Sequence, residues 1–354
     1  EIIPENSLII FNDTKVIHAR ILFEKPSGTP IEIFCLEPNE KEIQVTFSSK
    51  ESCEWKCMVG NLKRWKNEIL EKKIITDAGE LILKAEKIKV VNDSVNVRFS
   101  WIPMKMSFAE ILNHFGVLPL PPYLNRENIE SDEVRYQTVY AHQNGSVAAP
   151  TAGLHFTSTV FEKLKIKNIE TEFFTLHVGA GTFKPVKSET MEEHEMHEEQ
   201  IFVSLELIEK IISKLGKEKI VAVGTTSLRM LESLYWYGVK LLNGVDSDEM
   251  IVEQWEPYEV QSLKFKVENS LKAVVEMMVK KNISVLKGST KILIAPTYEF
   301  KVVDVLITNF HQPESTLLLL VAAFAGKKWK DIYDYALKNN FRFLSYGDSS
   351  ILVR

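Results

Sequence analysis

One stretch of the chain places a histidine in a turn of small residues between a strand and a helix. Residues 145–157 read as a short buried strand, a tight turn at Pro150 and Gly153, and a helix that begins after Thr157. Small residues let a ligand approach the backbone closely, and His155 lies in this turn. Because an imidazole titrates near neutral pH, the pattern predicts proton transfer at this position.

Three further segments repeat the order of apolar strand, polar turn and helix start. These segments are residues 8–15, 220–229 and 305–320. The turn of the second segment contains Thr225, Thr226, Ser227 and Arg229. Helix-start N–H groups and a guanidinium attract an anion or a carboxylate, although simple N-capping with a surface arginine is an alternative. Four such junctions predict one composite pocket at the ends of strands.

Other polar residues follow predicted strands and extend this list of candidates. They are Asp13, His177, Asn309 and His311. His177 precedes a Gly-x-Gly loop, a weak signal that a turn with a core histidine explains equally well. Asp13 is either a buried carboxylate with a raised pKa or part of an Asx turn. The helix after His311 has Ser315 and Thr316 as candidate caps.

Aromatic and cationic residues gather in one loop region and suggest contact with a nucleobase or an RNA strand. The set is Tyr123, Arg126, Arg135, Tyr136, Gln137, Tyr140 and His142. Stacking surfaces and guanidinium groups suit such ligands, although a loop packed on the sheet is the competing interpretation. The net charge of −5 gives no general attraction for nucleic acid. Local basic stretches, such as the one that contains Lys63, Arg64 and Lys66, would therefore have to contact RNA.

Metal and disulfide chemistry find little support in the sequence. His194 and His197 would share a face of a helix, but their spacing is not that of a zinc protease and five glutamates surround them. We therefore expect a solvated surface there and no metal. The three cysteines are sparse and are predicted to be ordinary strand positions in a reducing compartment. The longest apolar run, 317–325, is too short to cross a bilayer.

The elements that position these residues predict an α/β protein with an inserted β-barrel. Residues 19–102 form short alternating strands, including one over 43–47, and indicate a small barrel. Residues 1–18 and 103–354 alternate strands with helices and indicate an α/β domain with a mixed sheet. Residues 237–290 contain an amphipathic helix and are predicted to be a folded insertion. The absence of a dinucleotide fingerprint disfavours hydride transfer.

Many long motifs in one order resemble the S-adenosylmethionine:tRNA ribosyltransferase-isomerase family of queuosine biosynthesis. They span residues 11–17, 118–123, 135–140, 145–157, 176–186, 193–197, 224–233, 307–326 and 345–348. Two departures stand out. The family's usual stretch before the first motif is absent, so we expect a missing N-terminal segment, and residues 237–290 are longer than the corresponding link in many members.

The resemblance implies transfer of the ribosyl part of S-adenosylmethionine to 7-aminomethyl-7-deazaguanine at the wobble position of tRNA. The products would be epoxyqueuosine, adenine and methionine. It implies no metal and no cofactor, because S-adenosylmethionine is consumed as a substrate. The expected partners are tRNA and S-adenosylmethionine, for a cytoplasmic monomer without membrane contact. The alternatives are a tRNA methyltransferase with the same donor, or a tRNA-binding module without catalysis.

This chemistry needs a base that removes the C5′ proton beside the sulfonium. The candidates are His155, His177, His311 and Asp13, and we favour His155 because its turn allows the closest approach. The resemblance leads us to expect methionine carboxylate binding by Thr225, Thr226, Ser227 and Arg229. It further places Tyr136 and Gln137 against deazaguanine or adenine, and Gly153 and Asn309 among the substrate-binding residues. For the phosphates of tRNA the expected contacts are Lys63, Arg64, Lys66 and Arg126.

Overall fold

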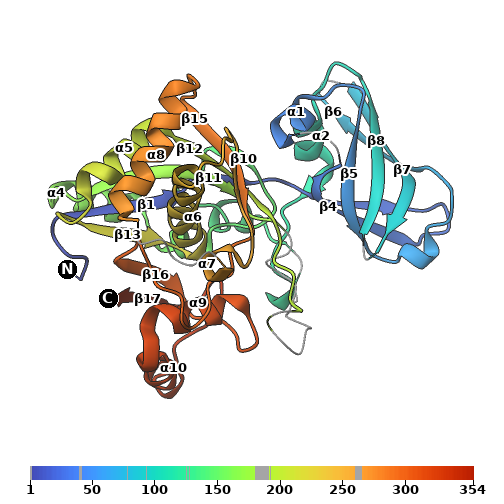
Figure 1. Cartoon of the computed structure of the whole chain (residues 1–354). Helices are drawn as coiled ribbons and strands as arrows, with labels where there is room; N and C mark the ends of the chain where they lie inside the picture. Colours follow the sequence, from blue (N-terminus) through green and yellow to red (C-terminus); the bar gives the residue numbers. More distant parts are fainter. Residues whose placement is uncertain are drawn as a thin grey trace. The chain divides into compact units, whose positions relative to one another are not determined.

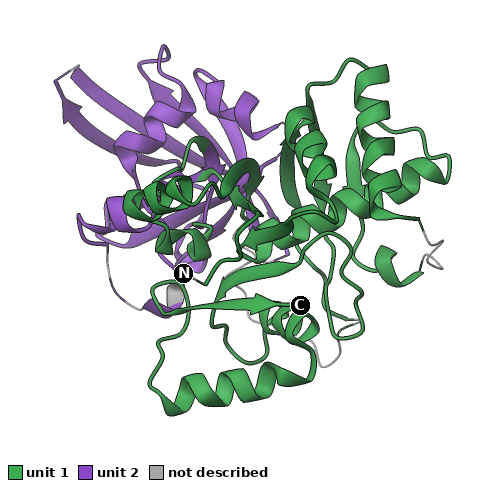
Figure 2. Ribbon diagram, turned by 90° about the vertical axis from the view of Figure 1, so that its left-hand side faces the viewer, with its two compact units in different colours: residues 1–14, 137–143, 149–354 green, residues 15–136, 144–148 purple. Residues whose placement is uncertain are grey.

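The chain folds into two compact units, which Figure 2 shows in different colours. The computed structural model describes residues 2–39, 42–77, 79–92, 94–124, 126, 128–179, 191, 193–259 and 265–354. The larger unit comprises Glu1–Thr14, Gln137–Gln143 and Ala149–Arg354. The smaller unit comprises Lys15–Tyr136 and Asn144–Ala148.

A mixed sheet of eight strands forms the centre of the larger unit (Figure 1). In spatial order the strands are β14 (Met250–Val252), β15 (Val285–Thr290), β12 (Glu199–Ser204), β11 (Glu170–His177), β1 (Ser7–Asn12), β13 (Lys219–Val223), β16 (Val305–Asn309) and β17 (Ser349–Val353). The neighbours β11, β1, β13 and β16 are parallel, whereas β12 and β17 run antiparallel to the strands they adjoin. The predicted mixed α/β class is confirmed, and four carboxyl ends of strands meet at one sheet edge.

Helices follow several of these strands. They are α4 (Ser158–Ile166), α5 (Leu205–Lys214), α6 (Thr225–Leu242), α7 (Glu256–Glu259), α8 (Val267–Lys280), α9 (Thr316–Ala325) and α10 (Trp329–Lys338), together with the 3₁₀ turns η3 (Thr151–His155) and η5 (Gly326–Lys328). Thr157, Ser204 and Ser315 accept a backbone N–H at the starts of α4, α5 and α9. These hydroxyls cap the three helices and fix where each one begins, and Ser315 is one of the two caps predicted for α9.

The central strand β1 is buried along its whole length. Its apolar run Leu8–Phe11 has parallel partners on both sides, so neither edge of the strand meets solvent. Phe11 packs edge-on against Phe156, with 4.8 Å between ring centroids, and against Tyr140 at 5.0 Å. This packing attaches the turn that carries His155 to the core of the sheet.

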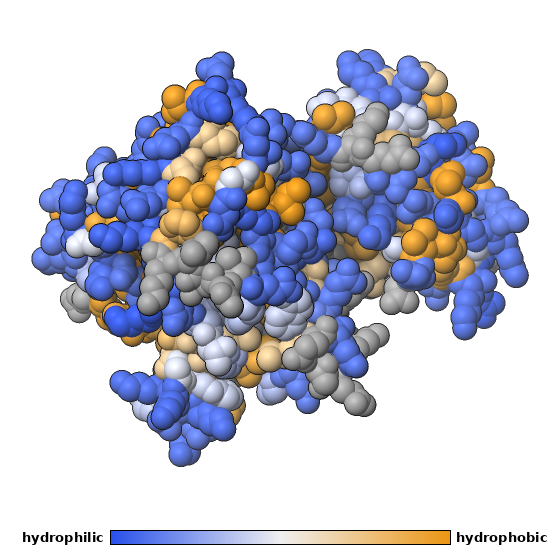
Figure 3. All heavy atoms as spheres, in the orientation of Figure 1, coloured by the Kyte–Doolittle hydropathy of each residue, from blue (hydrophilic) through white to orange (hydrophobic). Residues whose placement is uncertain are grey.

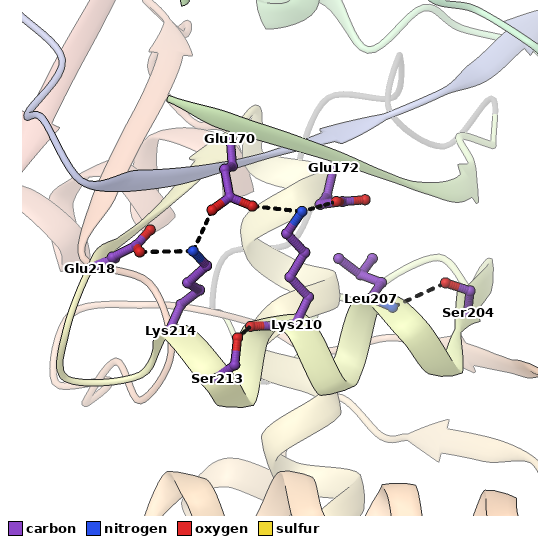
Figure 4. A network of polar contacts seen from close by, with 8 residues as sticks. All are labelled: Glu170, Glu172, Ser204, Leu207, Lys210, Ser213, Lys214 and Glu218. Carbon is purple, nitrogen blue, oxygen red and sulfur yellow. Dashed lines mark hydrogen bonds and ion pairs between the residues drawn. The ribbon is translucent and has the colours of Figure 1, made fainter. Parts of the chain in front are cut away.

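Ion pairs fasten α5 to β11, as Figure 4 shows. Lys210 Nζ lies 2.7 Å from Glu170 Oε2 and 2.5 Å from Glu172 Oε1, and Lys214 pairs with Glu170 and Glu218. Each half-exposed pair contributes at most about 1 kcal/mol. The Glu170 carboxylate pairs with both lysines and aligns α5 with β11, the strand that ends in His177.

The predicted insertion at 237–290 belongs to the same sheet and is not a separate body. The helix α6 continues to Leu242, and β14 and β15 extend the sheet beyond β12. Packing of α8 on α6 requires Gly238, since an added Cβ would lie 2.1 Å from the Ser270 carbonyl oxygen. Ser270 Oγ donates to the Tyr235 carbonyl and secures this close approach.

The smaller unit contains a seven-stranded antiparallel sheet. In spatial order its strands are β6 (Leu70–Thr76), β7 (Gly79–Val91), β8 (Ser94–Ile102), β5 (Ser52–Val59), β4 (Pro30–Pro38), β3 (Arg20–Glu24) and β9 (Gly116–Val117). The sheet curls enough for β3 to contact β6. Short elements complete the unit, namely α1 (Ile43–Ser48), η1 (Leu62–Arg64), α2 (Phe108–Phe115), η2 (Pro122–Leu124) and α3 (Asp132–Arg135), with β2 (Thr14–Val16) and β10 (Gln143–Ser146) paired at its boundary.

The observed elements differ from the predicted ones in three places. The smaller unit extends past the predicted limit of residue 102, because β9 pairs with β3 and Phe108 of α2 packs against Trp55. The ring centroids of Phe108 and Trp55 lie 5.7 Å apart. Residues 43–47 are helical, since Ile43 and Phe47 lie on one helix face as readily as on one strand face. Residues 292–294 form an apolar run that is typical of a buried strand, yet they belong to no strand of either sheet.

Hydrophilic residues cover most of the face drawn in Figure 3, and hydrophobic residues form smaller groups among them. Among the described residues, no helix is long and apolar enough to span a membrane.

Candidate active site

A pocket opens at the carboxyl edge of the larger unit's sheet, and we call it the sheet-edge pocket. It is partly open to solvent and lies at the sheet edge where open α/β sheets bind their ligands. Its lining residues include Thr151, Ala152, Val178, His194, Met196, His197, Glu199, Gly224, Thr225, Thr226, Arg229, Leu293, Thr308, Asn309, His311, Ser315 and Thr316. Three of the four predicted junctions, at 145–157, 220–229 and 305–320, therefore contribute residues to one pocket.

Arg229 lies on α6 in the wall of the pocket and is 7% exposed. Its Nη1 donates to Glu199 Oε2, and its Nε donates to the Ile292 carbonyl at 3.2 Å. Within the described part of the chain its buried Nη2 has no hydrogen-bond partner. An unpaired guanidinium N–H in a pocket wall is a strong donor for an anionic ligand.

The start of α6 adds further donors to the same wall. Gly224 is the N-cap with φ of +88°, a conformation that favours glycine. Thr225 and Thr226 line the pocket, and the buried Thr226 Oγ1 lacks a partner among the described residues. Ser227 is different, because its Oγ donates to the Val223 carbonyl at 2.6 Å inside the helix. The observed geometry thus gives Ser227 a structural contact.

His311 is the predicted histidine whose side chain lines the pocket. Its Nε2 is 2.9 Å from Thr308 Oγ1, and its backbone N–H donates to Tyr333 Oη at 3.0 Å. Burial lowers the pKa of His311 to about 4, so its imidazole is neutral at physiological pH. A neutral imidazole in this position accepts or donates one hydrogen bond to a ligand.

His155 lies at the end of η3 and does not appear in the described lining of the pocket. Its Nε2 is 3.0 Å from Asn309 Oδ1, while Asn309 Nδ2 donates to Thr151 Oγ1 at 3.0 Å. Because the amide oxygen only accepts, His155 Nε2 carries the proton and Nδ1 is the basic nitrogen. His155 is therefore joined to the pocket wall through Asn309, which lines it.

His177 and Asp13 belong to a second polar group at the neighbouring strand ends. His177 Nδ1 lies 2.9 Å from Thr14 Oγ1, and its buried Nε2 has no partner among the described residues. Thr175 Oγ1 donates to Asp13 Oδ1 at 2.7 Å, and burial raises the pKa of Asp13. The Asx-type contact belongs to Asn12, whose Oδ1 accepts from the Thr14 N–H. Neither His177 nor Asp13 is in the described pocket lining.

The two buried histidines predict that the protein loses stability in acid. Burial lowers the pKa of both His177 and His311 from 6.5 to about 4. At these two sites the unfolded chain therefore binds more protons than the folded chain, and their contribution to the free energy of unfolding falls as the pH falls. We expect a loss of about 1–3 kcal/mol per histidine between pH 6.5 and 4.5.

Urea titrations across this pH range measure the effect. His177→Asn should flatten the pH dependence, whereas the matched variant at exposed His114 should leave it unchanged. A pH dependence of His177→Asn that equals that of the wild-type protein would contradict the assignment of a neutral buried imidazole at His177.

Gly153 has a packing role that explains its position beside His155. An added Cβ would lie 2.0 Å from Tyr140 Oη, which is part of the aromatic group around Phe11. We expect Gly153→Ala to cost about 1–3 kcal/mol of unfolding free energy and to shift η3. Thermal unfolding measures this cost, with Gly60→Ala as the control, because its added methyl group would meet Glu32 Cβ at an ordinary 3.4 Å.

The remaining predicted contacts lie outside the described pocket lining. Tyr136 is fully buried in the smaller unit, and Gln137 is half-buried in the larger one. Lys63, Arg64 and Lys66 are exposed at and beside η1. Arg126 forms a bidentate pair with the buried Asp132 at 2.6 and 2.8 Å, so its guanidinium is partly engaged within the smaller unit. The loop at residues 180–186 that follows His177 lies outside the described residues.

Comparison with known proteins gives the family. Residues 1–352 match the family described as "Queuosine biosynthesis protein". The chain belongs to this queuosine biosynthesis family. It is 37% identical to the S-adenosylmethionine:tRNA ribosyltransferase-isomerase of Halothermothrix orenii, over 98% of this chain and 84% of that protein. It is 39% identical to the enzyme of the same name from Buchnera aphidicola, over 99% of this chain and 83% of that protein.

A crystal structure of S-adenosylmethionine tRNA ribosyltransferase from Thermotoga maritima is also similar, with 26% identity, a TM-score of 0.41, and coverage of 98% of this chain and 83% of that one. The family resemblance predicted from the motifs is confirmed, and with it the prediction of an enzyme that acts as a transferase and isomerase in queuosine biosynthesis.

The pocket of this queuosine biosynthesis family member contains residues that the sequence reasoning did not assign to substrate. Glu199 is buried beside Arg229, and His194 and His197 also line the pocket. Residues 194–198 are not helical, so His194 and His197 do not share a helix face. Gln254 instead holds this segment, since its side chain accepts from the Met196 N–H at 2.8 Å and donates to the His194 carbonyl at 2.6 Å.

The motif Glu193–His197 was the available signal for this wall, but its acidic surroundings read as solvated surface. Among the described residues, no group of three or more His, Cys, Asp or Glu side chains is placed to hold a metal ion.

Proposed function

We propose that the sheet-edge pocket binds S-adenosylmethionine and that the chain transfers and isomerises its ribosyl part onto 7-aminomethyl-7-deazaguanine at the tRNA wobble position. The products are epoxyqueuosine-tRNA, adenine and methionine. The observation that supports this most directly is the pair of unpartnered donors in the pocket wall, Arg229 Nη2 and Thr226 Oγ1. In a member of the queuosine biosynthesis family, these donors match the carboxylate of the methionine end.

The reaction begins with removal of the C5′ proton beside the sulfonium. The ribose ring opens and adenine leaves, the aminomethyl nitrogen then bonds to the ribosyl carbon chain, and an epoxide closes as the C–S bond to methionine breaks. His155 is the proposed base and acts through Nδ1, because Nε2 donates to Asn309. His311 is the alternative base, since it lines the pocket and follows β16. Asp13 follows β1 and His177 ends β11, which are the second and third strands from β16.

Recognition of tRNA is proposed for local basic residues of a chain whose net charge is −5. Lys63, Arg64 and Lys66 are exposed and suit phosphate contacts, with Arg126 beside Asp132 as a further candidate. Gln137 is proposed to contact the deazaguanine or adenine, whereas Tyr136 is fully buried and is not proposed to contact either base. Replacement of Lys63, Arg64 and Lys66 by Ala should weaken tRNA binding. The slope of the logarithm of the binding constant against the logarithm of the salt concentration should fall by the equivalent of about three phosphate contacts. Fluorescence titrations at several salt concentrations measure this, and binding that ignores added salt would contradict it.

We take the curled sheet of the smaller unit as a half-open barrel inserted in the α/β unit. The reaction needs no metal and no cofactor beyond the consumed S-adenosylmethionine, so a chelator should leave adenine release unchanged. The protein works as a monomer in the cytoplasm, where its tRNA substrate is found, and sedimentation tests the monomer.

One assay tests the function as a whole. The protein is mixed with S-adenosylmethionine and tRNA that carries the aminomethyl base, and adenine and the mass of the tRNA are followed. Free adenine together with a heavier tRNA is the expected result. S-adenosylhomocysteine as the product would indicate a methyltransferase, and tRNA binding without either product would indicate a binding module.

A further inference from the structure

We infer that Glu199 and Arg229 act as one unit that reads both charges of an α-amino-acid group, the carboxylate through Arg229 and the ammonium through Glu199. The inference rests on the proposed function for its ligand, S-adenosylmethionine. It adds a specificity determinant, because it makes the amino-acid end of the ligand the part that the pocket selects.

The geometry brings the two charges to one wall from distant parts of the chain. Glu199 is the first residue of β12, where it pairs in register with Thr290 of β15, and Arg229 lies one turn into α6. Glu199 is 5% exposed and Arg229 is 7% exposed, yet both line the pocket. The pair therefore offers an acceptor and a donor side by side to whatever occupies the space.

A purely structural ion pair would leave fewer donors unused. Burying a guanidinium is costly unless its N–H groups are paired. Here Nη1 and Nε have partners, whereas Nη2 and the nearby Thr226 Oγ1 have none among the described residues. A bound carboxylate would supply the two missing acceptors, one from each of its oxygens.

Charge balance explains why the ligand's ammonium is also needed. The Glu199–Arg229 pair is neutral as a whole, and so is an amino-acid group with one ammonium and one carboxylate. Two neutral pairs of alternating sign fit together without leaving a net buried charge. A carboxylate alone would place a second negative charge against Glu199, and an ammonium alone would lie beside Arg229 with Nη2 still unpaired.

Calorimetric titration of the wild-type protein tests this with three ligands. They are S-adenosylmethionine, its decarboxylated form and its deaminated form. We expect each incomplete ligand to bind at least tenfold more weakly, because a pocket group is left unpaired. Equal affinity for all three would overturn the inference while leaving the proposed function intact. If S-adenosylmethionine itself fails to bind, the proposed function is contradicted. The inference is then tested with S-adenosylhomocysteine, which has the amino-acid group, and 5′-methylthioadenosine, which lacks it.

A variant separates recognition from structure. Glu199→Gln keeps the shape of the side chain and removes its charge, so the preference for the complete ligand over the deaminated one should fall about tenfold. Glu198→Gln is the matched control, since Glu198 is adjacent and exposed and pairs with Lys291 at 3.4 Å. A Glu199→Gln protein that weakens all ligands by the same factor would show a structural role only and would overturn the inference.

Discussion

His155→Ala should stop adenine release while leaving tRNA affinity nearly unchanged. Loss of a positioned general base typically costs a factor of about 10²–10⁴ in rate, which makes this the largest kinetic effect expected in the molecule. The side chain is exposed and its one observed hydrogen bond goes to Asn309, so its removal should not disturb the core. Single-turnover release of adenine measures the effect.

The comparison with His311→Ala identifies which histidine removes the proton. His311 lines the pocket but is neutral and buried, and its loss should alter ligand binding as well as rate. The exposed His114 provides a control substitution of the same type in the smaller unit. Near-normal adenine release by His155→Ala, with a severe loss in His311→Ala, would transfer the role of base to His311.

Glu232→Leu should cause the largest loss of stability among the substitutions considered. The Glu232 carboxylate on α6 is fully buried and accepts from Tyr298 Oη at 2.8 Å and from the backbone N–H groups of Lys301, Val302 and Val303 at 2.9–3.1 Å. Its removal leaves four donors without an acceptor. Each unpaired buried donor costs about 1–3 kcal/mol, and we expect a total loss of at least about 3 kcal/mol after local rearrangement.

Urea unfolding at constant pH measures this loss. Trp236 Nε1 donates to Tyr298 Oη at 2.8 Å and belongs to the same network, and the fluorescence of the chain's six tryptophans follows its unfolding. Glu276→Leu on the exposed face of α8 is the control and should change stability by less than about 0.5 kcal/mol. If Glu232→Leu behaves like this control, the carboxylate is not the anchor of residues 298–303.

The strand ends were predictable because their signals are local. The runs 8–11, 220–223 and 305–308 are apolar and stop at polar turns, which is typical of buried parallel strands. His177 shows the limit of this reasoning. Successive residues of a strand face opposite sides, so Val178 lines the pocket while His177 contacts Thr14. The glycine loop after the strand does not show which of two successive residues faces the pocket.

Glu199 was not predicted because its environment is created by distant contacts. It ends an acidic stretch that is typical of a solvated surface, and only the pairing of β12 with β15 buries it. The same holds for Gln254, which lies 60 residues from the His194 carbonyl that it contacts. Long-range pairing of this kind leaves no local pattern in a single sequence.

The two hydrogen bonds of Gln254 have a consequence for any attempt to shorten the protein. Residues 237–290 were predicted to be an insertion, yet a truncation there would remove the two outer strands β14 and β15 and the Gln254 contacts that hold the wall at His194 and Met196. These residues are therefore part of the unit that carries the sheet-edge pocket. An engineered minimal enzyme would have to keep β14, β15 and Gln254, and any deletion would have to be made in another part of the chain.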